Sequence, residues 1–507
     1  MLAKTLAGAT IGLHGVLVTV EIDVAGRGFP TFTIVGLPNK SVDESKERVR
    51  TALTNTGYDM PDSRITVNMA PADIPKSGSA FDLAIAIGIL AASGVIPQST
   101  LENKMLLGEL SLEGNVRKIN GIVPLILLAQ EEKLPEVIIP KENAGEASIF
   151  EDMIMYPVSN LQELIDHLLE RKLIQKYIPV STFAEDEELL FHHNFSQIKG
   201  QEQAKRALEI AAAGFHNIHL KGTPGAGKTL LSRSMPSILP RLEKQEMLEV
   251  AKIYSVVGEL SDETFHGVRP FRSPHHTTSR VGLIGGGSTP MPGEISMAHR
   301  GVLFLDEFPE FPRNVLEAMR QPLEDGVVTV SRAAGTLTFP ARFLLLAASN
   351  PCPCGYLGHP KKSCKCAPGM IMRYKKRLSG PLLDRIDLHI DVPPVEIDEL
   401  SDEYESESSK AVRSRVKKAR KIQEKRFSAD THLFNSEMSS TDVKKYCVLS
   451  EDAQQMLKTA VERLALSARS YFKTIKVART IADLEGFKVI ESAHIAEALQ
   501  YRAKESQ

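Results

Sequence analysis

The stretch from residue 222 to residue 229 reads Gly222-Thr223-Pro224-Gly225-Ala226-Gly227-Lys228-Thr229 and matches the pattern G-x-x-x-x-G-K-[ST] at every fixed position. The apolar residues Ile218-His219-Leu220 before it are typical of a strand, and the residues after it can continue as a helix. In such a loop the glycines let backbone N–H groups turn toward phosphates, the lysine reaches the β- and γ-phosphates, and the threonine hydroxyl ligates Mg²⁺. The stretch therefore predicts a site for a nucleoside triphosphate.

A second strand ends in two carboxylates. The run Gly301-Val302-Leu303-Phe304-Leu305 is apolar throughout and leads directly into Asp306 and Glu307. Neighbouring residues face different directions, so Asp306 can hold the Mg²⁺ shell while Glu307 orients and deprotonates a water. The alternative is that both acids only cap the following helix.

Two more polar positions fit the same site. Another apolar strand, residues 343–349, ends at the amide of Asn350, which is suited to contact a γ-phosphate or the attacking water. Arg385 follows Leu382-Leu383-Asp384, where it could meet the nucleotide of a neighbouring subunit. The alternative for this arginine is a local ion pair with Asp384 or Asp387.

These motifs, in this order, resemble the AAA+ ATPases. The sequence around them resembles the magnesium-chelatase-like ComM/YifB family over nearly the whole chain. The segments that carry the narrower resemblance are Arg272-Ser273-Pro274-His275-His276-Thr277, Gly285-Gly286-Gly287-Ser288, Pro292-Gly293-Glu294-Ile295-Ser296 and Asn350-Pro351-Cys352-Pro353-Cys354-Gly355. The resemblance implies that Asn350 is sensor 1 and that Arg385 is an arginine finger acting in trans. It implies Arg469 as sensor 2, with Arg479 as the rival for that role.

The bulk composition fits a soluble globular protein of several domains. The chain has 507 residues, 42% of them hydrophobic and 24% charged, and a formal net charge of −2. Without a global basic excess, any contact with nucleic acid must come from local patches. We find no window long and apolar enough to span a bilayer and no N-terminal signal pattern. Four of the five cysteines crowd into residues 352–366, which indicates a reducing compartment, and the expected location is cytoplasmic.

Residues 1–170 are expected to form a first α/β domain. Alternating apolar residues predict strands at 18–24 and 65–69, a helix precedes Gly57, and residues 81–93 predict a buried helix. The domain resembles the Lon-type proteolytic domain, with Ser79 at the serine. Where that family carries lysines, however, this chain has Val123-Pro124-Leu125. A serine without a base is a weak nucleophile, so we expect no protease activity unless Lys76 or Lys118 substitutes.

The remaining chain divides into a charged linker at 171–194, an ATPase core at 195–395 and a helical C-terminal lid at 396–507. The interval between Lys228 and Asp306 is longer than a strand-helix-strand unit needs, so we expect an insertion there, with residues 266–294 as its content. His275 and His276 have no Cys or acid at ligand spacing, which favours a loop or pore contact over a metal. Residues 327–339 predict a hairpin whose tip carries Arg332, a candidate DNA contact. The first lid helix is very basic, as a solvated face or a nucleic-acid face would be.

The cysteines form two CxC pairs, Cys352/Cys354 and Cys364/Cys366, in a loop rich in Gly, Pro and Lys. Four thiolates in one segment can close a tetrahedral Zn²⁺ site, the alternative being free thiols. The same loop carries Lys361, Lys362 and Lys365, which could contact a phosphate backbone.

Together the motifs predict an ATP- and Mg²⁺-dependent hydrolase. The family resemblance implies a homo-hexameric motor that moves along single-stranded or branched DNA and drives branch migration during DNA uptake and recombination. A magnesium-chelatase motor subunit and an ATP-dependent Lon-like protease remain the alternatives.

Overall fold

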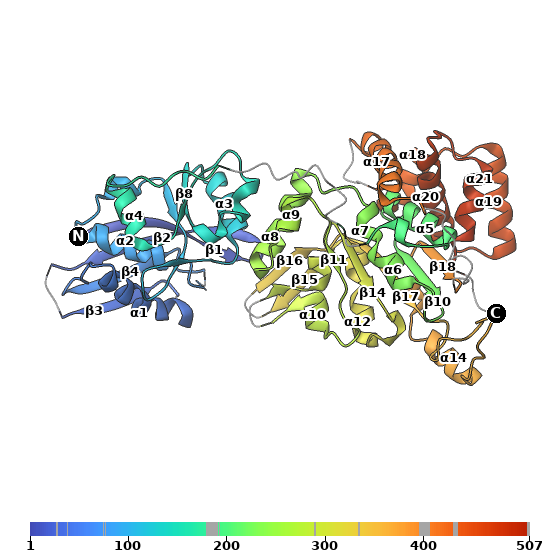
Figure 1. Cartoon of the computed structure of the whole chain (residues 1–507), viewed down its shortest axis with the longest axis horizontal. Helices are drawn as coiled ribbons and strands as arrows, with labels where there is room; N and C mark the ends of the chain where they lie inside the picture. Colours follow the sequence, from blue (N-terminus) through green and yellow to red (C-terminus); the bar gives the residue numbers. More distant parts are fainter. Residues whose placement is uncertain are drawn as a thin grey trace. The chain divides into compact units, whose positions relative to one another are not determined.

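A computed structural model describes residues 1–503 except 27–28, 38, 75, 77, 179–190, 192, 288–289, 333–334, 395–405 and 429–433 (Figure 1). The chain divides into two compact units. The first combines residues 1–183 with residues 244–266, and the second combines residues 184–243 with residues 267–507. Residues 185–188, the acidic part of the expected linker, lie outside the described residues.

The first unit is built on a mixed sheet in the order β3-β4-β2-β1-β5-β8-β9. The strands are β1 (Leu2–Ile11), β2 (His14–Val24), β3 (Thr31–Val35), β4 (Arg64–Ala70), β5 (Lys104–Leu106), β8 (Glu136–Pro140) and β9 (Ile154–Val158), with a small separate pair, β6 (Glu109–Leu110) and β7 (Val116–Arg117). Antiparallel pairs join β1 to β2 and β2 to β4, whereas β5, β8 and β9 run parallel to β1. The predicted strands at 18–24 and 65–69 are confirmed.

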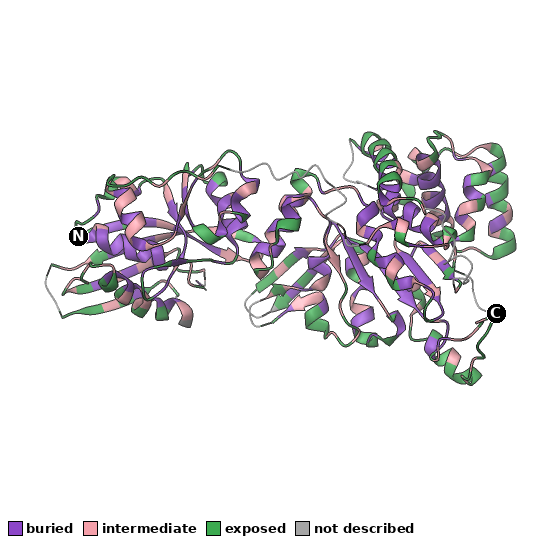
Figure 2. Cartoon of the chain, viewed as in Figure 1, coloured by how far each residue is buried: buried purple, intermediate pink, exposed green. Residues whose placement is uncertain are grey.

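Helices cover this sheet: α1 (Lys40–Asn55), α2 (Asp82–Ala92), α3 (Ile122–Glu131) and α4 (Leu161–Leu168). The predicted buried helix is α2, which is drawn almost wholly as buried in Figure 2 and packs on β1 and β2. The predicted helix before Gly57 is α1, and Gly57 follows it with a left-handed φ of 86°. Both helical predictions are therefore confirmed.

A helical segment from much later in the chain completes the first unit. Helices α8 (Lys244–Val257) and α9 (Asp262–Phe265) precede the acidic strand in sequence, and α8 packs against α3. Ser255 accepts the free backbone N–H groups at the start of α3, from Gly121 at 2.7 Å and from Val123 at 3.2 Å. By their position in the sequence, residues 244–266 are expected in the core at 195–395. Their place in the first unit was not apparent, because an amphipathic pattern does not say which partner covers a helix.

The second unit contains a sheet whose strands all run parallel, in the order β11-β14-β17-β10-β18. The strands are β10 (Ile218–Gly222), β11 (Phe271–Arg272), β14 (Val302–Leu305), β17 (Leu344–Ser349) and β18 (Leu388–Val392). Every residue of β14 and β17 is buried, which agrees with the long apolar runs that predicted them. Helices α5 (Glu202–Gly214) and α6 (Lys228–Arg233) pack on β10, and α7 (Met235–Ile238) packs on α5 and α6. The parallel sheet confirms the predicted α/β class.

Short helices and strands connect the strands of this sheet. They are α10 (Arg280–Ile284), β12 (Gly285–Gly286), β13 (Met291–Pro292), α11 (Glu294–Met297), α12 (Arg313–Ala318), α13 (Arg320–Asp325), α14 (Pro368–Lys375) and α15 (Gly380–Leu383). The predicted hairpin is confirmed as β15 (Val327–Arg332) and β16 (Gly335–Pro340). The Arg332 side chain lies outside the described residues, so its contact with DNA stays a prediction.

The C-terminal helices share a hydrophobic core with the parallel sheet of the second unit. They are α17 (Ser409–Arg426), α18 (Ser440–Tyr446), α19 (Glu451–Leu464), α20 (Ala468–Glu485) and α21 (Ser492–Gln500). Helix α17 is the predicted basic helix, and two of its arginines point inward. Arg420 donates to the Ala212 carbonyl at 2.8 Å, and Arg413 donates to the Ser237 carbonyl at 2.8 Å. These arginines therefore fix the helix to the core, while the lysines of α17 are exposed.

Candidate nucleotide-binding site

The glycine-rich loop joins the carboxyl end of β10 to the start of α6. Gly225 and Gly227 have left-handed φ values of 81° and 85°, and a Cβ added to either would meet nothing within 4 Å. Their backbone therefore borders open space in a conformation that side-chain-bearing residues rarely adopt. The loop has the shape and the exposed backbone that a phosphate cradle requires.

Lys228 lies beneath this loop with its ammonium group held by oxygens. Its Nζ donates to the carbonyls of Gly222 at 2.7 Å and Thr223 at 3.0 Å, and to Oδ1 of Asn350 at 3.2 Å. Burial lowers the pKa of Lys228, opposed by the nearby carboxylate of Asp306. Strand β17 lies between β10 and β14, which is why Asn350 reaches Lys228. The structure thus brings two of the predicted site residues together.

The oxygen ligands expected for Mg²⁺ also meet. The Thr229 hydroxyl lies 3.1 Å from Oδ2 of Asp306, whose other oxygen accepts the Glu307 backbone N–H at 2.9 Å. A hydroxyl and a carboxylate are donors that Mg²⁺ uses in nucleotide sites, where water and phosphate oxygens complete its shell. These residues therefore fit the predicted metal.

Glu307 and Asp306 have different side-chain partners, His276 for Glu307 and Thr229 for Asp306. The φ of Glu307 is 51°, its side chain is about half exposed, and Oε2 lies 3.0 Å from Nδ1 of His276. No acid lies at ligand spacing from the two histidines in the sequence, so local pattern does not predict this contact. Since His276 and Glu307 come from different loops, only the fold could reveal the pair.

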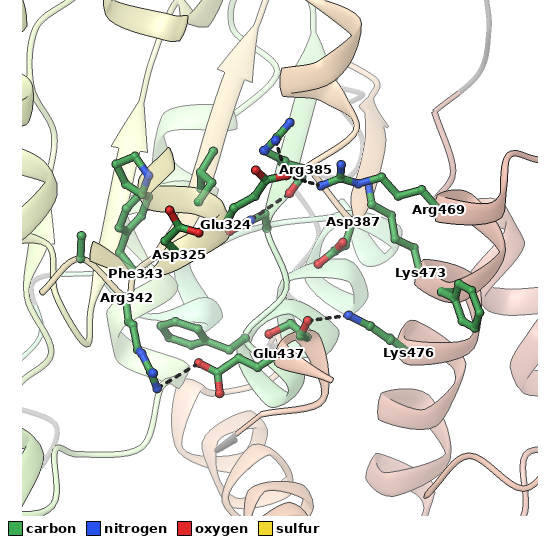
Figure 3. Close-up of a pocket in the computed structure, with 18 of the residues that line it drawn as sticks. Glu324, Asp325, Arg342, Phe343, Arg385, Asp387, Glu437, Arg469, Lys473 and Lys476 are labelled. Atoms are coloured by element: carbon green, nitrogen blue, oxygen red, sulfur yellow. Dashed lines mark hydrogen bonds and ion pairs between the residues drawn. The ribbon is translucent and has the colours of Figure 1, made fainter. Parts of the chain in front are cut away.

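A separate cavity of about 540 Å³ lies at the opposite edge of the sheet (Figure 3). Both charge signs line it: the cations are Arg342, Arg385, Arg469, Lys473 and Lys476, and the acids are Glu324, Asp325, Asp387 and Glu437. Arg385 is buried and forms an ion pair with Glu324, not with Asp384 or Asp387, the partners that the sequence analysis considered. Arg469 lies 3.5 Å from the same Glu324 carboxylate. The structure therefore gathers both predicted arginines around one acid.

The length of strand β10 sets the distance between this cavity and the glycine-rich loop. Leu388, at the start of β18, pairs with Ile218 at the start of β10, and Asn217 donates to the Arg385 carbonyl at 2.9 Å. The glycine-rich loop begins after Gly222, at the other end of β10, so the two sites are separated by the length of a strand, about 16 Å. Arg385 therefore cannot reach the loop of its own chain.

The rival for the sensor 2 position, Arg479, is committed to the core of the C-terminal helices. Its side chain is 1% exposed, and it donates to Asp483 at 3.1 Å and to the Lys488 carbonyl at 2.7 Å. Arg469 lies in the first turn of α20 and is 45% exposed. Of the two, only Arg469 is placed to contact another molecule.

The four clustered cysteines come together in space. All four Sγ atoms lie within 4.8 Å of one another, and Cys352 lies 3.5 Å from Cys354 and 3.6 Å from Cys364. Four thiolates around a tetrahedral zinc ion are about 3.8 Å apart, because each Zn–S bond is about 2.3 Å. Backbone N–H groups of Tyr356 and Lys365 lower the pKa of the Cys354 thiol to about 6, whereas burial and the neighbouring thiols raise the pKa of Cys364 against a backbone hydrogen bond from Cys366. The cluster therefore fits Zn²⁺.

The lysines of the same loop face solvent. Lys361, Lys362 and Lys365 are exposed, and the Lys362 ammonium lies 5.0 Å from the centre of the Tyr356 ring. Exposed cations on a short segment can neutralise phosphates without first breaking an ion pair. Their predicted role in DNA binding stays a prediction.

In the first unit, the side-chain contact that the structure describes for the serine at the protease-like position is with an acid. The Ser79 hydroxyl donates to the carboxylate of Glu109, and Lys76 donates to the Pro71 carbonyl. Val123 and Leu125, which stand where the Lon-type family carries lysines, are buried within α3. Lys118 pairs with Glu146 at 2.7 Å. The described contacts therefore give Ser79 an acid as its partner and supply none of these lysines as a base.

Fold and site define the chain as a P-loop nucleotide-binding protein of the AAA+ type. Family models match three segments: "Magnesium chelatase, subunit ChlI" at residues 194–400, "Subunit ChlI of Mg-chelatase" at residues 20–143, and "Magnesium chelatase, subunit ChlI C-terminal" at residues 406–502. The chain belongs to the magnesium-chelatase-like ComM/YifB family, whose AAA+ core indicates an ATPase.

Relatives match over almost the full length. Competence protein ComM of Haemophilus influenzae is 45% identical over 99% of this chain and 97% of its own. The uncharacterized protein YifB of Escherichia coli is 41% identical over 98% of this chain and 96% of its own. Similarity to Lon protease 2 of Bacillus subtilis is partial, with 35% identity over 25% of this chain and 22% of that protein. In the described parts of the chain, no helix has both the length and the apolar character needed to cross a membrane.

Proposed function

We propose that this protein is a ring-forming ATPase, a homo-hexamer, that converts ATP hydrolysis into movement along DNA. Its task would be branch migration of recombining strands during DNA uptake, in the cytoplasm. The observation that carries the proposal is the placement of Arg385 and the glycine-rich loop at opposite edges of one sheet. A chain with this layout needs a neighbour to complete its site, and head-to-tail contacts of that kind close into rings.

Each residue then has a defined part in hydrolysis. Lys228 and the loop amides hold the β- and γ-phosphates, while Thr229 and Asp306 hold the metal. Mg²⁺ would neutralise charge on the phosphate oxygens. Glu307 orients the attacking water and accepts its proton, and Asn350, already hydrogen-bonded to Lys228, positions that water or the γ-phosphate.

The cavity that holds Arg385 and Arg469 would complete the site from the neighbouring chain. Arg385 would leave Glu324 for the γ-phosphate, and Arg469 would follow because it shares that carboxylate. Glu324 keeps both guanidinium groups oriented until a stronger anion arrives, since Arg–phosphate contacts are bidentate and doubly charged. Hydrolysis would in this way depend on assembly.

Contact with DNA is supported by relationship and by local charge. The full-length relative from Haemophilus is named a competence protein, and the lysines at 361, 362 and 365 together with Arg332 would supply cations. The zinc cluster would hold the lysine loop in shape. Cys352, Cys354, Cys364 and Cys366 are the proposed ligands.

A second candidate function, a motor subunit of a magnesium chelatase, is favoured by the family-model descriptions. Near-complete coverage of the competence protein, including the first unit, favours the DNA motor. A Lon-like protease is opposed by the buried Leu125.

ATPase turnover measured without DNA and with single-stranded, duplex and four-way-junction DNA separates these functions. The Glu307→Gln variant serves as the inactive control. The proposal expects turnover to rise with DNA, most of all with the junction. Turnover that is the same with and without every DNA would contradict it.

A further inference from the structure

The cysteine cluster is joined to the nucleotide site through very few residues. Asn350, which accepts the Lys228 ammonium at 3.2 Å, is two positions before Cys352. The first cysteine of the cluster is therefore only two residues away from the residue that contacts Lys228.

A second contact runs from the cluster to the glycine-rich loop itself. Gly355 is buried directly after Cys354, with a left-handed φ of 81°. A Cβ at this position would lie 2.6 Å from Cγ and 2.7 Å from Cδ of Pro224. Backbone at Gly355 thus packs on the loop that binds phosphate, and only glycine allows this approach.

The segment that makes both contacts has little else to hold it. Residues 350–367, all of them described, lie outside helices and strands, and most of their side chains are exposed or half-buried. A loop of this length without secondary structure is uncommon in a compact domain unless something orders it. Metal coordination by four thiolates is one device that orders such a segment.

Building on the proposed ATPase function, we propose that Zn²⁺ bound by the four cysteines positions Asn350 and Gly355 against Lys228 and Pro224, so that zinc occupancy sets the rate of ATP hydrolysis. Zinc is then a positioning element of the nucleotide site as well as a support for the lysine loop. Asn350 and Gly355 flank the first CxC pair, Cys352 and Cys354. The second pair, Cys364 and Cys366, would complete the coordination of the metal.

The test uses the Cys364→Ser/Cys366→Ser double variant, which leaves the sequence from Asn350 to Gly355 unchanged. Cys447→Ala is the matched control, because Cys447 is a buried free thiol outside the cluster. Three quantities are measured on full-length protein in excess Mg²⁺: zinc content, hydrogen exchange of residues 350–355 and 222–229, and ATP turnover with the affinity for an ATP analogue.

We expect about one zinc ion per chain in wild type and in Cys447→Ala. The double variant should lose zinc, exchange faster at both segments, and turn over ATP roughly tenfold or more slowly, because a small misplacement of a positioning group is costly. Affinity for the ATP analogue should change less, since Lys228 and the loop amides remain. Chelation of wild-type zinc should reproduce these effects, and added Zn²⁺ should reverse them.

Wild-type protein without zinc, purified under reducing conditions free of chelator, would overturn the proposal. Zinc loss that leaves turnover and hydrogen exchange unchanged would also overturn it. If zinc-loaded wild type hydrolyses no ATP, the proposed ATPase function fails instead. In that case, hydrogen exchange compared between zinc-loaded and zinc-free protein still tests whether zinc orders residues 350–355 and 222–229.

Discussion

Replacing Arg385 by alanine should remove catalysis while leaving the fold and the nucleotide affinity in place. The guanidinium lies at the edge of the sheet opposite to the glycine-rich loop, and its partners are Glu324 and the Pro381 carbonyl. Since the side chain does not reach its own Lys228, its loss should not change how one chain binds ATP.

The Arg385→Ala substitution should lower turnover far more than it lowers the free energy of unfolding. Removing an arginine finger costs about 10³-fold or more in turnover, which corresponds to about 4 kcal/mol or more in activation free energy. The loss in unfolding free energy should be only about 1–2 kcal/mol, because Glu324 is 47% exposed and keeps Arg469 as a neighbour, so that mainly buried side-chain packing is lost.

Mixed rings provide the assay. Arg385→Ala chains retain Lys228, and Lys228→Ala chains retain Arg385, so each mutant lacks what the other supplies. In a randomly mixed ring at equal ratio, roughly a quarter of the sites pair an intact Lys228 with an intact Arg385 across a head-to-tail contact. Turnover should therefore recover to roughly a quarter of the wild-type value, from near zero for either mutant alone.

Co-assembly must be established by recovering an untagged mutant with a tagged one. Mixed particles that show no recovery at any ratio would refute catalysis in trans. Full activity of Arg385→Ala alone would reduce this arginine to a structural partner of Glu324.

Three further predictions concern other parts of the chain. Glu307→Gln should bind ATP with unchanged affinity but hydrolyse it at least about 100-fold more slowly, because an amide cannot accept the proton of water; near-normal turnover would remove Glu307 from the base role. Ser79→Ala should leave ATPase activity unchanged, and wild type should not cleave casein with ATP; serine-dependent cleavage would overturn the inactive assignment. Asp483→Ala should destabilise the C-terminal helices by about 3–5 kcal/mol in chemical unfolding, because it strips the buried Arg479 and Arg426 of their shared carboxylate; a loss under about 1 kcal/mol would contradict that role.

Features set by local pattern could be predicted from the sequence. The glycine-rich loop, the acidic strand and the strand before Asn350 each carry their signal within a few residues, and the structure places all three side by side in the sheet. The convergence of Lys228, Asn350, Thr229 and Asp306 follows, because the carboxyl ends of parallel strands share one edge.

Features set by distant partners could not be predicted. The contact between His276 and Glu307 joins two loops, and the partner of Arg385 proved to be an acid on α13 and not one of its neighbours in sequence. Arg420 looked like part of a solvated basic face. It is instead buried against the last turn of α5, where backbone carbonyls lack helical partners and accept its guanidinium.

A branch-migration assay on a labelled four-way junction tests the central claim most directly, because it measures movement along DNA and not hydrolysis alone. Wild-type protein with ATP and Mg²⁺ should convert the junction into its migrated duplex products. The Glu307→Gln variant, and wild type with a non-hydrolysable ATP analogue, should bind the junction but leave it intact. Wild-type protein that hydrolyses ATP yet leaves every junction unchanged, or products that form equally without hydrolysis, would contradict a motor that moves branched DNA.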